Sequence, residues 1–138
     1  MRSMADTEIV HWLREFEGAC RGRDFATGRG MFAEDAVAFG TWATAVSGLA
    51  NIEREQWRNV WPRIREFRFE AHPATGMTAD AAWAAAAWSS DATGPDGKPF
   101  TRSGRATFVL ARRDGRWLCV HSHVSLLPTQ SESVHGRL

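Results

Sequence analysis

One stretch near the C-terminus decides the fold, residues 113–125, which read Arg113-Asp114-Gly115-Arg116-Trp117-Leu118-Cys119-Val120-His121-Ser122-His123-Val124-Ser125. Asp114-Gly115 is the strongest short hairpin signal in the chain, because a two-residue turn between strands needs residues that tolerate positive φ angles. Runs suited to strands flank this turn, back to Phe100 and forward to Leu126. The stretch therefore predicts an antiparallel hairpin of two long strands, 100–113 and 116–126.

Two further strands are expected upstream of this hairpin. Residues 82–91 read as a strand of the same meander because turn signals bracket them, although their consecutive alanines favour a helix by propensity. Residues 67–71 alternate apolar and charged side chains, which is typical of a half-exposed strand.

The N-terminal half is predicted to hold three helices. Residues 6–22 repeat apolar side chains at helical spacing, and Asp24 is placed to cap a short second helix that ends at Phe32. A third helix begins after Ser47-Gly48 and ends near Pro62. Its apolar stripe consists of Leu49, Ile52, Trp57, Val60 and Trp61.

Between the second and third helices, a short strand is expected to end at Gly40 and to return through 41–46 as a hairpin arm. Helices first and a long sheet afterwards imply an α+β fold with the helices on one face. The chain is read as one domain over residues 1–138, with an ordered core of about 6–128 and a polar tail at 129–138.

Composition excludes several classes of function. The formal net charge of +1 supplies no field for nucleic acid or an anionic membrane, and acidic residues interleave with the arginines of every basic cluster. The longest apolar run, Ala81 to Trp88, is far too short for a membrane span. Cys20 and Cys119 lie far apart in apolar surroundings, which indicates free thiols in a cytoplasmic protein. The excess of arginine and alanine suggests a GC-rich bacterial genome, and no motif indicates a cofactor.

Three segments resemble the nuclear transport factor 2-like superfamily, in its SnoaL-like and ketosteroid isomerase-like branch. Residues 31–37, Met-Phe-Ala-Glu-Asp-Ala-Val, look like its junction of second helix and first strand. Residues 47–52, Ser-Gly-Leu-Ala-Asn-Ile, are similar to the turn that opens its third helix, and residues 113–125 look like its last hairpin. That hairpin also resembles the association domain of calcium/calmodulin-dependent kinase.

The resemblance implies a cone-shaped, curved antiparallel sheet whose concave face is closed by the three helices around a pocket. It also implies a homodimer formed through the convex face. Enzymes and non-catalytic binding modules both use this frame, so the fold alone narrows function little.

The residues needed for steroid isomerase chemistry are absent. By resemblance, the tyrosine of the isomerases falls on Phe16, their first aspartate on Phe39 or Gly40, and their second on Phe108. None of these side chains transfers a proton or donates a hydrogen bond, and the loss of one oxyanion donor alone costs about a hundred- to a thousandfold in rate. We therefore expect no steroid isomerase activity by that mechanism.

The family frame instead predicts a pocket for a small hydrophobic or aromatic molecule. Its expected lining consists of Phe16, Phe39, Trp57, Trp61, Trp88, Phe108, Val120, Ser122 and Val124. The alternative for the aromatic residues is an ordinary filled core. Arg102 and Arg105 lie on the strand near the expected mouth, either to attract an anionic group or as solvated edge charges.

His121 and His123 are the most suggestive polar pair. They sit two apart on one strand and so share a face, which is predicted to hold Trp117, Cys119 and Ser125 as well. As an acid–base pair they would favour a lyase, isomerase or hydrolase. No third ligand accompanies them for a metal, and we expect them to point outward as interface residues unless a β-bulge intervenes. The remaining alternative is a non-catalytic dimerisation module.

Overall fold

The computed structural model describes residues 4–128, so the predicted polar tail lies outside the described residues. The helical elements are α1 (Met4–Gly22), α2 (Phe25–Met31), α3 (Leu49–Ile52), the π-helical turn η1 (Glu53–Trp57), α4 (Arg58–Val60) and the 3-10 turn η2 (Trp61–Arg63). The strands are β1 (Phe32–Phe39), β2 (Val46–Ser47), β3 (Ile64–Phe69), β4 (Ala74–Met77), β5 (Ala81–Thr93), β6 (Pro99–Arg113) and β7 (Arg116–Leu126).

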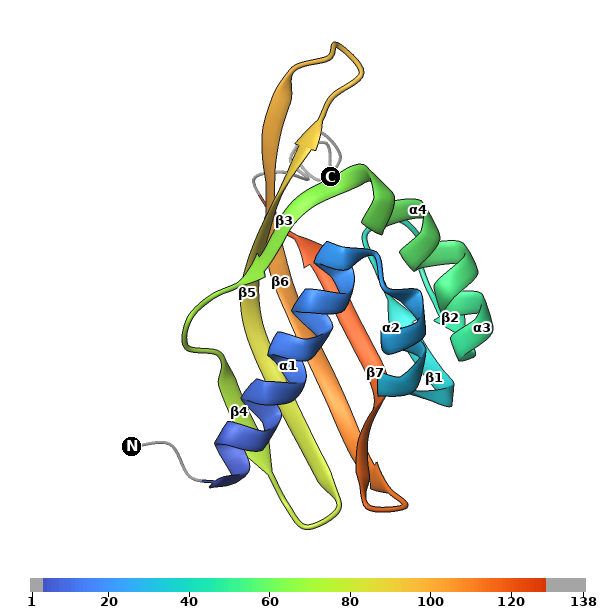
Figure 1. The fold of residues 1–138 in the computed structure, drawn as a ribbon, viewed down its shortest axis with the longest axis vertical. Helices are drawn as coiled ribbons and strands as arrows, with labels where there is room; N and C mark the ends of the chain where they lie inside the picture. The colour runs from blue at the N-terminus through green and yellow to red at the C-terminus, as the bar shows by residue number, and fades with distance from the viewer. Residues whose placement is uncertain (1–3, 129–138) are drawn as a thin grey trace.

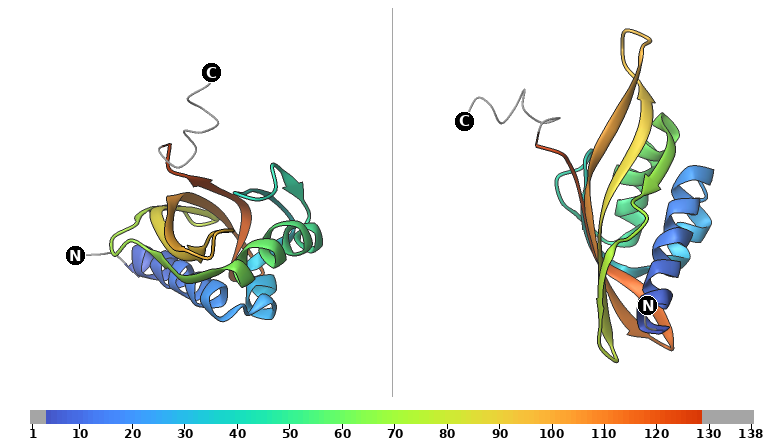
Figure 2. Two further views of the ribbon diagram at one scale, coloured as in Figure 1. Left: turned by 90° about the horizontal axis from the view of Figure 1, so that it is seen from above. Right: turned by 90° about the vertical axis from the view of Figure 1, so that its left-hand side faces the viewer.

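The strands form one curved sheet, in the order β2-β1-β7-β6-β5-β3, with β4 paired to β5 as well. All helices lie on its concave side, where α1 crosses the long strands (Figures 1 and 2). The α+β cone with helices on its concave face is therefore confirmed. Within the described part of the chain, every helix is too short or too polar to span a bilayer.

The predicted hairpin 100–113/116–126 forms with the expected turn, since Asp114 and Gly115 both adopt positive φ angles, 53° and 74°. Helix α1 is followed by Arg23 in a left-handed conformation, and the Asp24 amide donates to the Ala19 carbonyl at 2.8 Å. Asp24 then caps α2 through the Thr27 amide, at 3.1 Å.

One feature of the sheet differs from the fully antiparallel arrangement expected, because β1 pairs with β7 in parallel. The second helix is also one residue shorter than predicted, since Phe32 already pairs with Cys119. The alternation within β1 indicates a strand but carries no information on its partner. The free edge of β7 and the direction in which the chain leaves α2 set that pairing.

The expected hairpin arm at 41–46 is reduced to β2, which pairs only with Val37 and Ala38. The side chain of Gln56, in η1, accepts the hydrogen bonds that a strand partner would otherwise accept. The Gln56 Oε1 atom accepts hydrogen bonds from the amides of Ala43 (2.7 Å) and Trp42 (3.3 Å). These backbone donors are thus satisfied without a ladder.

Two features near β3 were not predicted from the sequence pattern. Glu66 adopts a positive φ of 53° where the β3–β5 register shifts, which brings both Phe67 and Phe69 into the core. The strand β4 was not predicted, because Gly76 weakens its pattern. A Cβ atom at Gly76 would lie against the Trp83 indole, which explains why this strand position has no side chain.

Candidate ligand pocket

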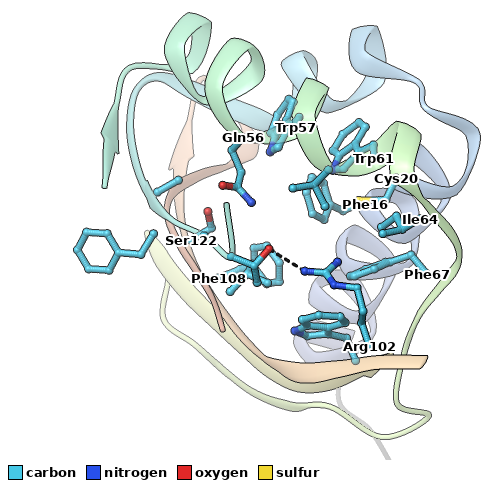
Figure 3. A pocket seen from close by; sticks show the side chains of 17 residues that line it. Phe16, Cys20, Gln56, Trp57, Trp61, Ile64, Phe67, Arg102, Phe108 and Ser122 are labelled. Atoms are coloured by element: carbon cyan, nitrogen blue, oxygen red, sulfur yellow. Dashed lines mark hydrogen bonds between the residues drawn. The ribbon is translucent and has the colours of Figure 1, made fainter. Parts of the chain in front are cut away.

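An apolar cavity lies between the concave face of the sheet and the helical segment of residues 49–63 (Figure 3). Its volume is about 60 Å³. One water molecule takes about 10–15 Å³ of such space, so the cavity has room for a few waters or a small ligand. Sites for drug-sized ligands are several times larger, at about 300–1,000 Å³.

Aromatic side chains from six elements form most of its wall. They are Phe16 of α1, Trp57 of η1, Trp61 of η2, Phe67 of β3, Trp88 of β5 and Phe108 of β6. The indoles of Trp57 and Trp61 stack with centroids 4.8 Å apart, and the ring of Phe16 meets that of Phe108 edge-on at 5.4 Å. Because each ring packs against others, the wall is preorganised rather than collapsible.

A buried ion-pair cluster anchors the π-helical turn that carries this wall. The Glu53 carboxylate accepts hydrogen bonds from Arg29 of α2 at 2.6 Å and from the Arg58 Nε atom at 2.8 Å. Burial raises the pKa of Glu53, but these hydrogen bonds and charges outweigh it and hold that pKa below its usual value. The cluster therefore ties η1 to α2 at neutral pH.

Two of the predicted lining residues are placed differently from the expectation. Val120 does not line the cavity, because it is the extra residue of a β-bulge in β7, between the pairs Val109–His121 and Leu110–Cys119. Phe39 borders the cavity, but its side chain is 38% exposed and its ring packs on the imidazoles of His121 and His123.

The same bulge divides β7 into two halves with opposite facing. Before it, Cys119 is fully buried in the core and Trp117 packs against α1, where its indole donates to Glu8 at 3.2 Å. The prediction that these two share a face with the histidines was therefore wrong. Beyond the bulge, Ser122 and Val124 line the cavity.

His121 and His123 are absent from the cavity lining. The Nδ1 atom of His121 lies 2.8 Å from the Val37 carbonyl oxygen, so this nitrogen carries the proton and donates it. Both rings meet Phe39 edge-on, at centroid distances of 4.9 and 5.3 Å. Among residues 4–128, no group of three or more His, Cys, Asp or Glu side chains is placed to hold a metal ion.

Four polar side chains line the cavity, namely Thr41 and, from different sides, Gln56, Arg102 and Ser122 (Figure 3). The Arg102 guanidinium donates to the Thr41 hydroxyl at 3.1 Å, and its Cζ atom lies 5.6 Å from the Trp88 ring centroid. Burial lowers the pKa of Arg102 from its usual value. Arg105, three residues on, is exposed and lies 3.4 Å from the Ser125 hydroxyl.

The described lining contains neither a carboxylate nor an imidazole. Its one thiol, Cys20, is buried, and burial followed by the charge of Glu17 raises its pKa well above the ordinary value. The thiol is therefore protonated and a poor nucleophile at neutral pH. The cavity thus offers hydrogen-bond donors, a cation and apolar walls, but no general base.

Gln56 is a polar lining residue that no sequence pattern indicated. Its position on the helix is that of a surface residue, one before Trp57, and only the fold of residues 41–45 over the helix brings it inside. Arg102 was noted at the expected mouth, but the strand pattern did not indicate that its head group turns into the cavity.

Comparison with solved structures agrees with this architecture. A nuclear transport factor 2-like superfamily protein from Salmonella enterica matches with a TM-score of 0.76 at 20% identity, over 87% of this chain and 89% of that one. A ketosteroid isomerase-like protein from Erwinia carotovora atroseptica gives 0.75 at 17% identity, over 88% and 95%. The association domain of C. elegans CaMKII gives 0.69 at 21% identity, also over 88% and 95%.

These identities establish a shared fold and nothing about activity. Curated protein sequences give no match. The model of the SnoaL-like domain matches residues 9–130, which is most of the chain and includes every wall of the cavity. The chain therefore belongs to the SnoaL-like family, within the nuclear transport factor 2-like fold.

Proposed function

We propose that the protein binds a small hydrophobic or aromatic molecule in the cavity and performs no acid–base chemistry on it. The observation that carries this proposal is the lining itself, which combines six buried aromatic side chains with hydrogen-bond donors and contains no carboxylate or imidazole. The volume of about 60 Å³ limits the ligand to one aromatic ring that extends partly into the mouth, since an apolar cavity that encloses benzene measures about 150 Å³. The alternative lyase, isomerase or hydrolase would need His121 or His123 at the ligand, and both lie outside the lining.

The test is a binding titration with neutral single-ring probes, benzyl alcohol and benzamide. Trp57, Trp61 and Trp88 line the cavity, so an occupant should change the tryptophan fluorescence and raise Tm. Ala38→Leu fills the cavity from β1 and should abolish the signal, whereas Ala50→Leu, on the exposed side of α3, should leave it unchanged.

Absence of saturable binding to the wild-type protein would contradict the proposal, and so would equal binding by Ala38→Leu. If Ala38→Leu fails to fold because of overpacking, binding is judged from the wild-type protein alone, by whether each probe raises its Tm. A stable dimer that binds neither probe would favour the dimerisation module instead.

We also propose a homodimer through the convex face of the sheet. Two rows of aligned residues cross that face, Trp83–Val109–His121–Val37 and Ala85–Thr107–His123–Phe39. Trp83 is 44% exposed and Phe39 38%, and the helices lie on the opposite side of the sheet (Figure 2). An apolar face of this kind is typical of association sites.

Sedimentation should give a dimer at micromolar concentration, and Trp83→Lys should shift it toward monomer. A wild-type monomer under these conditions would contradict the homodimer.

Both cysteines are free and buried, which is consistent with a reducing compartment, and we propose the bacterial cytoplasm as the site of action.

A further inference from the structure

Arg102 stands out among the arginines because its charge faces an apolar cavity. Its guanidinium turns inward from β6 toward Trp88 and Phe67 (Figure 3), and its protein hydrogen bond goes to a neutral hydroxyl, that of Thr41. Within residues 4–128, no carboxylate lies within ion-pair distance of it. By contrast, Arg29 and Arg58 share the Glu53 carboxylate at 2.6 Å.

A partly desolvated cation without a counter-ion is unfavourable for the folded state. Such a group is tolerated when a bound molecule neutralises its charge, and the most direct partner is an anion bound beside the guanidinium. A guanidinium also presents paired N–H donors in a plane, which suits the two oxygens of a carboxylate.

Gln56 and Ser122, two other polar side chains of the cavity, supply donors as well. The Gln56 Oε1 atom is occupied by the amides of Ala43 and Trp42, which leaves the Nε2 hydrogens as the free polar part of this side chain. The Ser122 hydroxyl is buried at the cavity wall and has no hydrogen bond with any other residue in the range 4–128. An occupant that supplies acceptor oxygens therefore complements all three side chains.

The position of Arg102 also gives an anion a route inward. Val60, Ile64 and Arg102 border both the cavity and a groove on the outside of the molecule, which Trp42 and Phe100 flank. Trp42 is 56% exposed and Phe100 48%. Arg102 thus stands where the outer groove and the inner cavity meet, so that a charged group can stay near solvent while a ring enters the aromatic part.

We propose that the ligand of this pocket is a small aromatic carboxylate, with its ring among the aromatic walls and its carboxylate on Arg102 and Thr41. This inference rests on the proposed ligand-binding function and names the chemical class of the ligand. Arg102 is the residue that makes the pocket prefer an anion to a neutral molecule.

The test compares benzoate with benzamide, two probes of nearly equal shape that differ in charge, by calorimetric titration of the wild-type protein at neutral pH. Benzoate should bind at least about tenfold more tightly, as expected for a charge-assisted pair. R102Q should reduce this preference to within about twofold while benzamide still binds. R102K keeps the charge without the planar fork and should retain part of the preference. The matched control R105Q removes an exposed arginine of the same strand and should retain all of it.

Each result separates this inference from the function on which it rests. Equal affinity for benzoate and benzamide would overturn the carboxylate while leaving the binding function intact. Binding of neither probe, nor of benzyl alcohol, would overturn both. An undiminished benzoate preference in R102Q would show that another group selects the charge, and tighter binding of phenyl phosphate would overturn the carboxylate as the anion. If R102Q does not fold, the wild-type comparison and R102K decide.

Discussion

Gly28 of α2 lies directly against the indole of Trp57. A Cβ atom at Gly28 would come within 2.9 Å of Trp57 Cζ3 and 3.0 Å of Trp61 Cη2. Real Cβ atoms do not approach ring carbons so closely, so the absence of a side chain at this helical position lets the two stacked tryptophans form the cavity wall.

Gly28→Ala should therefore lower the free energy of unfolding by about 1–3 kcal/mol, as overpacking does. Gly30→Ala is the matched control in the same helix, because a Cβ atom there would meet only the Arg116 side chain at 3.9 Å. That control should raise stability by about 0.5–1 kcal/mol, since alanine favours helix over glycine. Urea unfolding measures both, and equal effects of the two substitutions would contradict the close packing at Gly28.

Phe108 connects the cavity to the rest of the core. Its ring is 1% exposed and lies 5.4 Å from those of Trp12 and Phe16 and 5.8 Å from that of Phe69. Phe108→Ala should destabilise the fold by about 3–5 kcal/mol through the lost contacts and the enlarged cavity. Glu15→Ala, at an exposed position of α1, should change the free energy of unfolding by less than about 0.5 kcal/mol. A loss below about 1 kcal/mol for Phe108→Ala would mean that the ring borders open space rather than packed core.

Glu53 should contribute a pH-dependent part of stability. Its folded-state pKa lies below that of the unfolded chain, so the stabilisation is present above the unfolded pKa and is lost as the pH falls through the folded pKa. Glu53→Gln should cost about 1–2 kcal/mol at pH 7, because the carboxylate is buried while both arginines are half-exposed.

That difference between wild type and Glu53→Gln should shrink as the pH is lowered from 5 to 3, in urea unfolding at each pH. Glu55→Gln is the matched control, since this exposed carboxylate contacts only the exposed Arg54 at 3.5 Å. It should change stability by less than about 0.5 kcal/mol at any pH. A constant cost of Glu53→Gln from pH 7 to 3 would rule out the ion-pair explanation.

Replacement of His121 and His123 by asparagine should weaken dimer association and leave ligand binding unchanged. The imidazoles pack on Phe39 outside the cavity lining, and His121 donates to the Val37 carbonyl. Sedimentation and the fluorescence titration measure the two properties separately, and Ser122→Ala should show the converse pattern. Lost ligand binding with intact association in the histidine double variant would show that these side chains act on the ligand.

The sequence by itself determined the elements whose signals are local. The Asp114-Gly115 turn, the apolar face of α1 and the alternation in β5 and β6 specify a helix-then-sheet fold, because turn chemistry and periodicity act between residues close in the chain. The apolar stripes of the helices hold Phe16, Trp57 and Trp61, and the strands hold Trp88 and Phe108. The family resemblance turns these residues toward a pocket, and all five line the cavity.

Only the tertiary structure decided the features that depend on distant partners. The parallel pairing of β1 with β7, the extra residue at Val120 and the inward turn of Arg102 leave no periodic trace in their own segments. A one-residue bulge reverses the facing of all residues beyond it, so alternation alone could not place both Cys119 and Ser122 on the inner side. The position of the guanidinium in turn depends on Thr41, which is 61 residues away and brought near by the fold.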